Sequence, residues 1–151
     1  HVEDALVSMQ LRDAPVFLTP TPLNTLLWRV VVMTDDGYLE GFDSLMIDEG
    51  RLRFKAHPSA VDAMEDASDV WAVERLRWFA QDFVQARIDD DKLVISDLRM
   101  GQQPTYVFSH AVAARGNPHW KAIPAELLPM SFGDRALAET WDRIWRDREA
   151  E

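Results

Sequence analysis

Asp97 and Arg99 are the residues of this 151-residue chain whose types and spacing best suit chemistry. They lie two positions apart, and on a β-strand this spacing places both side chains on the same face. A guanidinium offers a planar fork of donors that matches a carboxylate or a phosphate, and a neighbouring carboxylate can orient it. The pair therefore indicates a polar site near the end of a strand, where Gly101 permits a positive φ.

Two further polar residues extend this pair to a candidate cluster. Its members are Asn24, Arg29, Asp97 and Arg99. One interpretation is a binding site for a small anion, and the other is a structural cluster whose ion pairs and hydrogen bonds fix the register of the strands. We favour the structural interpretation, because ionisable clusters hold structure more often than they catalyse.

Arg29 needs a partner because it interrupts the longest nearly continuous apolar run, residues 26–33. A guanidinium that is buried without a carboxylate costs several kcal/mol. We expect Asp97 to be this partner, with Glu40 and Asp43 as the alternatives.

The spacing of the histidines indicates no metal site and no cofactor in this chain. The chain has four, His1, His57, His110 and His119. None of them forms a His-x-x-x-His pair, which is a common ligand spacing for zinc. The aspartate runs at 35–36 and 89–91 are better explained as turns than as cation sites. Because the chain has no cysteine, thiolate chemistry is excluded, and no Gly-x-Ser-x-Gly motif indicates a serine nucleophile.

The composition is that of one ordinary globular domain. Acidic residues outnumber basic ones by 26 to 16, which gives a formal net charge of −10. This balance argues against nucleic acid as a partner, because phosphate backbones attract basic surfaces. No apolar run approaches the ~20 residues that span a bilayer.

The hydrophobic pattern predicts alternating groups of helices and strands. Amphipathic helices are expected at 1–12 and 136–148, and a further helix is expected to begin at Ser68 or Asp69. Strands are expected at 26–33, 38–47, 52–56, 84–88, 92–98 and 106–112. Helical spacing places four tryptophans in the expected core: Trp71, Trp78, Trp141 and Trp145.

This order of elements favours an α+β fold. We expect a mainly antiparallel sheet of about six strands, with one helix packed across it and amphipathic helices at both ends. Residues 26–32 are expected to form an interior strand, because both of their faces are apolar apart from Arg29. The prediction is a single soluble domain over 1–151, with a core at 16–115 and a C-terminal loop and helix at 116–151.

Several short motifs together carry a family resemblance. They are PTPLNTLLWRV at 20–30, GY at 37–38, SL at 44–45, RLRWF at 75–79 and DLRMG at 97–101. Over about residues 19–114, the chain resembles the soluble C-terminal domain of a family of bacterial membrane-bound proteins named metal-dependent hydrolases.

The resemblance implies a full-length protein of the bacterial inner membrane, whose N-terminal part holds several spanning helices. That part would also carry the histidine and aspartate motifs of the hydrolase, and any divalent metal would bind there. None of those motifs occurs in this chain. We therefore expect a non-catalytic accessory or sensing domain whose partner is its own N-terminal membrane region. The domain itself could lie on the cytoplasmic or on the periplasmic side of the membrane.

Two other classes of function remain open. The chain could be an independent hydrolase or a small-anion-binding domain with its site around Asp97 and Arg99. It could also be a protein–protein interaction module, including one that forms a homo-oligomer.

Overall fold

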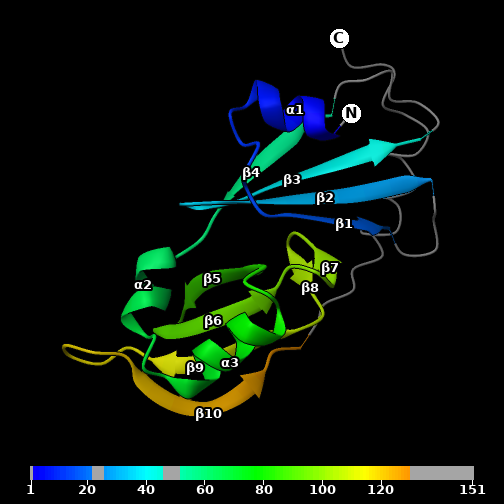
Figure 1. The fold of residues 1–151 in the computed structure, drawn as a ribbon. Coiled ribbons are helices and arrows are strands. Elements are labelled where there is room, and N and C mark those ends of the chain that lie inside the picture. Colours follow the sequence, from blue (N-terminus) through cyan, green and yellow to red (C-terminus); the bar gives the residue numbers. More distant parts are fainter. Residues whose placement is uncertain (1, 22–25, 46–51, 130–151) are drawn as a thin grey trace. The chain divides into compact units, whose positions relative to one another are not determined.

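The computed structural model describes residues 2–21, 26–45 and 52–129 (Figure 1). These residues form three helices and ten strands, and the strands make two four-stranded sheets and one two-stranded sheet. The described chain groups into two compact units. Unit 1 contains residues 2–21, 26–34, 39–45 and 52–57, and unit 2 contains residues 35–38 and 58–129.

The first sheet is built around β2, the longest apolar strand. Its strands are β1 (Val16–Pro20), β2 (Leu27–Thr34), β3 (Gly37–Ser44) and β4 (Phe54–Pro58), which lie in the order β1-β2-β3-β4. Helix α1 (Val2–Ser8) contributes Leu6 to a core that contains Val30 and Val32 of β2. The prediction that residues 26–32 form an interior strand is therefore confirmed, since β2 pairs on both of its edges.

The second sheet forms the centre of unit 2. Its strands are β5 (Val84–Asp89), β6 (Lys92–Asp97), β9 (Ser109–Ala114) and β10 (Lys121–Leu127), in the order β10-β9-β6-β5. The β5–β6 hairpin turns at Asp90 and Asp91, which both have positive φ. Aspartate tolerates this left-handed backbone better than most residues. A separate pair of short strands, β7 (Gly101–Gln102) and β8 (Thr105–Tyr106), follows β6.

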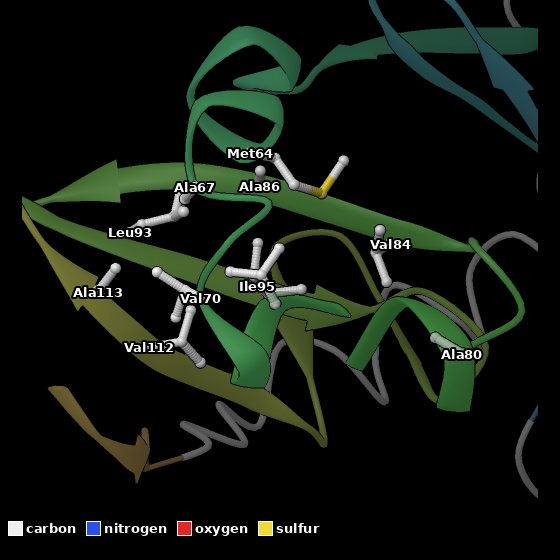
Figure 2. Close-up of a cluster of buried hydrophobic side chains, with 11 residues drawn as sticks. Met64, Ala67, Val70, Ala80, Val84, Ala86, Leu93, Ile95, Val112 and Ala113 are labelled. Atoms are coloured by element: carbon white, nitrogen blue, oxygen red, sulfur yellow. The ribbon is translucent and has the colours of Figure 1, made fainter. Parts of the chain in front are cut away.

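Two short helices bury the apolar side chains of the second sheet (Figure 2). They are α2 (Val61–Asp66) and α3 (Trp71–Phe79). Val73 of α3 and Met64 of α2 belong to the same buried cluster as Leu93 and Ile95 of β6. Leu93 and Ile95 lie two residues apart and therefore share a face of the strand.

The predicted α+β class with one sheet of about six strands is wrong. The described residues are mostly antiparallel sheet, divided between two four-stranded sheets and a small third one, and the helices are short. The sequence indicates only a short extended segment at 16–18 and no strand at 121–127, whereas the edge strands β1 and β10 contain Pro20 and Pro124. Proline removes a ladder donor and is tolerated at sheet edges. β10 also has almost no buried residue, so it lacks the alternating pattern that reveals a strand.

The two terminal helices of the sequence prediction have different outcomes. The N-terminal helix is present as α1, which is shorter than the expected 1–12. The expected helix at 136–148, with Trp141 and Trp145, lies outside the described residues. Within the described part of the chain, no helix has both the length and the apolar character needed to cross a membrane.

Candidate functional site

Asp97 and Arg99 form a closed ion pair in unit 2. Strand β6 ends at Asp97, and the next three residues form a turn. The Arg99 Nε donates to Asp97 Oδ1 at 3.0 Å, and the Arg99 Nη2 donates to Asp97 Oδ2 at 2.8 Å. The backbone N–H of Arg99 also donates to Asp97 Oδ1, at 2.9 Å. The two side chains therefore meet because of the turn, and not because they share one face of a strand.

This geometry changes what the pair can do chemically. The Nε–Nη2 fork, which would suit a carboxylate or phosphate ligand, already holds the carboxylate of Asp97. The hydrogen bonds that Arg99 donates to the Asp97 carboxylate raise the pKa of Arg99 above its ordinary value, so the guanidinium keeps its charge. The guanidinium carbon also lies 5.3 Å from the centre of the Phe79 ring. These contacts favour a structural role, in which the pair ties the end of β6 to the turn.

Arg29 pairs with Glu40 inside unit 1. Its Nε donates to Glu40 Oε1 at 2.6 Å, and the two side chains are only 2% and 7% exposed. Glu40 was one of the two alternatives to the expected partner, Asp97. Asp97 instead pairs with Arg99, and both of these residues belong to unit 2. The fourth member of the candidate cluster, Asn24, lies outside the described residues.

His57 is a member of this buried network that the sequence did not single out. Its Nε2 lies 3.7 Å from Glu40 Oε2, and its side chain is 9% exposed. Burial lowers the pKa of His57 below 6.5, and Glu40 opposes part of this effect. The alternation of polar and apolar residues through 52–57 gives His57 the same strand face as Lys55, which is exposed, and so indicates an exposed imidazole. That alternation does not reveal that the imidazole is buried.

Two pairs of hydroxyl groups are buried in unit 2. The hydroxyl oxygens of Tyr38 and Tyr106 lie 2.6 Å apart, and the Tyr38 hydroxyl donates to Gln103 Oε1 at 3.0 Å. The hydroxyls of Ser96 and Ser109 lie 2.8 Å apart, between neighbouring strands β6 and β9. These bonds satisfy buried polar atoms, which is the ordinary role of such pairs.

The described residues contain no group of three or more His, Asp or Glu side chains that could hold a metal ion. That this chain binds no metal stays a prediction, which elemental analysis of the purified chain can test.

The outer side of α3 carries a surface that the sequence prediction placed in the core. Trp71 is 75% exposed and Trp78 is 67% exposed, so their predicted burial is wrong. The seven-residue spacing correctly places them on one side of the helix. The buried side, however, is the opposite one, which carries Val73. Spacing shows which residues share a side, and the sheet decides which side is covered.

Charged residues complete this surface. We define the α3 surface as Trp71, Glu74, Arg75 and Trp78, in which the adjacent pair Glu74 and Arg75 lies three or four residues from each tryptophan. The guanidinium carbon of Arg75 lies 4.2 Å from the centre of the Trp78 ring, which is a cation–π contact. Glu74 Oε1 accepts a hydrogen bond from Arg77 Nη1 at 3.4 Å. Tryptophan and arginine are the residue types that contribute most to binding at protein interfaces.

Comparisons with protein-family models, with curated proteins and with solved structures found no match.

Proposed function

We propose that this chain is a non-catalytic accessory domain that works by binding protein through the α3 surface. The observation that carries this proposal is the exposure of Trp71 and Trp78 on the side of α3 opposite its core. A surface helix of a globular protein normally carries polar residues on its outer side. Large exposed apolar groups that cluster on one side of an element mark a site of association.

The wider setting of this domain follows the sequence resemblance. The motifs at 20–30, 75–79 and 97–101 support a C-terminal location in a bacterial inner-membrane protein. The N-terminal membrane region would then carry the metal-dependent chemistry and would be a partner of this domain. The motif at 75–79 includes Arg75 and Trp78 of the α3 surface.

Binding of a small anion at Asp97 and Arg99 is the competing function, and it can be tested directly. A thermal-shift screen with inorganic phosphate and small carboxylates compares the wild type with Arg99→Gln. Because the donor fork is occupied by Asp97, we expect no anion to stabilise the wild type, and we expect Arg99→Gln to melt at a lower temperature. Stabilisation of the wild type alone would favour an anion-binding domain instead.

Site-specific photocrosslinking tests the association itself. A photoreactive phenylalanine analogue replaces Trp71 in cells that express the complete gene product, and Lys121 on exposed edge strand β10 serves as the control position. We expect position 71, and not position 121, to form a covalent adduct with one defined protein, identified by mass spectrometry. The proposal fails if position 71 forms no adduct or the same adducts as position 121.

A further inference from the structure

The residue types and charges of the α3 surface match those of a second copy that lies antiparallel to it. Consider two α3 helices that meet antiparallel, with a twofold axis passing between residues 74 and 75. Position 71 of one copy then faces position 78 of the other, and position 74 faces position 75. Tryptophan occupies both members of the first pair, and glutamate and arginine occupy the second pair.

We propose that this chain forms a twofold-symmetric dimer by antiparallel packing of two α3 helices. This inference rests on the proposed function, because it names the partner of the same surface. Trp71 of each copy packs against Trp78 of the other copy, and this contact occurs twice. Glu74 of each copy faces Arg75 of the other, which places two opposite-charge pairs between the tryptophan contacts. The α3 surface thus supplies both halves of an isologous interface.

Charge supports a second copy over an anionic bilayer as the partner. The net charge of −10 makes an anionic membrane repulsive, and Glu74 lies between the two tryptophans in the same surface. Two copies of such an acidic chain also repel each other at long range. Association therefore requires local complementarity, which the Glu74–Arg75 pairs supply, together with apolar contact.

The size of the surface sets the expected strength of the dimer. An aromatic side chain can bury about 150–250 Å², so four tryptophans bury about 600–1,000 Å². Stable protein interfaces bury about 1,200–2,000 Å² in total. The four tryptophans alone therefore bury less than a stable interface does. Phe79 and Met100 are also exposed, and Arg99 contacts the Phe79 ring. The dimer should therefore be weak and should depend on concentration.

Sedimentation analysis with charge-reversal variants tests the arrangement. The molecular mass of the wild type is measured from about 5 µM to about 500 µM, a range that covers weak association. Glu74→Arg places arginine opposite Arg75 of the other copy, and Arg75→Glu places glutamate opposite Glu74. Both single variants should remain monomeric, whereas an equimolar mixture of the two should associate, because every facing pair is again of opposite charge. Glu65→Arg, an exposed site on α2, makes the same change in net charge and should behave as the wild type does.

Three results would overturn the proposed dimer. One is a wild type that stays monomeric at the highest concentration. Another is a Glu74→Arg variant that associates as the wild type does, which would place the interface elsewhere. The third is a mixture of the two single variants that remains monomeric although thermal melting shows both to be folded. A monomeric wild type whose position 71 still crosslinks to a different protein would overturn this inference alone and leave the proposed function standing.

Discussion

Glu40 accepts a hydrogen bond from the buried guanidinium of Arg29. We expect Glu40→Gln to lower the free energy of unfolding by about 3–5 kcal/mol, because it removes the negative charge from a buried ion pair. The measurement is urea unfolding at neutral pH. The double variant Arg29→Met/Glu40→Leu should lose less stability than Glu40→Gln, because it removes both charges together.

Glu126 provides the matched control for this prediction. It also pairs with a cation, Lys92, but both side chains are about half exposed. Exposed ion pairs contribute about 0–1 kcal/mol, so Glu126→Gln should have a small effect. Equal effects of Glu40→Gln and Glu126→Gln would show that the buried pair does not hold unit 1 together.

His57 should make the stability of the chain depend on pH in mildly acidic solution. Burial lowers the pKa of His57 in the folded chain below the ordinary value of 6.5. Below pH 6.5, the unfolded chain therefore binds more protons at this site than the folded chain does. Stability should be fully present above this value and should fall as the pH drops from 6.5 toward the folded pKa.

The groups that act on His57 are Glu40, which raises its pKa, and Lys55 and Arg29, which lower it. His57→Gln should flatten the fall in unfolding free energy, as measured by urea titrations from about pH 8 to about pH 5. His119→Gln, at an exposed position, is the control for replacing a histidine by glutamine. If the wild type and His57→Gln show the same slope, His57 does not titrate as its burial implies.

At the scale of the element, truncation should destabilise the chain on the buried side of α3 and have little effect on its exposed side. Val73 is fully buried in the core of unit 2, so Val73→Ala should lower the free energy of unfolding by about 2 kcal/mol. Trp71→Ala removes a much larger side chain from an exposed position and should change it by less than about 0.5 kcal/mol.

Both α3 variants should be measured at low protein concentration, because dissociation of a dimer would otherwise add to the free energy. A loss for Trp71→Ala as large as that for Val73→Ala would return Trp71 to the core and remove the basis of the α3 surface.

The strands show how far local pattern reaches. The apolar run that forms β2 and the Asp35-Asp36-Gly37 turn were predictable, because each signal lies within a few neighbouring residues. The edge strands β1 and β10 were not predictable in this way. Their prolines and exposed residues resemble loop, and only pairing with β2 and β9 holds them in extended form.

At the scale of the whole molecule, the absence of a metal site remains a prediction. We expect chelator-treated and re-dialysed protein to retain no stoichiometric zinc or manganese, because the histidines lack ligand spacing. Elemental analysis of the purified chain gives the answer. A retained metal that is lost in His110→Ala or His119→Ala would favour an independent hydrolase over an accessory domain.

The sequence by itself determined those features that depend on near neighbours. The tight turns, the interior strand around Val30, the need of Arg29 for a carboxylate and the common side of Trp71 and Trp78 all follow from residues a few positions apart. Each is governed by backbone preference or by the period of an element.

Only the tertiary structure decided how these elements meet. It placed Glu40 rather than Asp97 against Arg29, sorted the strands into two main sheets and buried the Val73 side of α3. Arg29 and Glu40 lie 11 residues apart on the neighbouring strands β2 and β3. The other two outcomes depend on contacts between segments that are more distant in sequence, so no local period specifies them. The same sheet contacts leave Trp71 and Trp78 exposed, because a helix that lies on one sheet can bury only one of its sides.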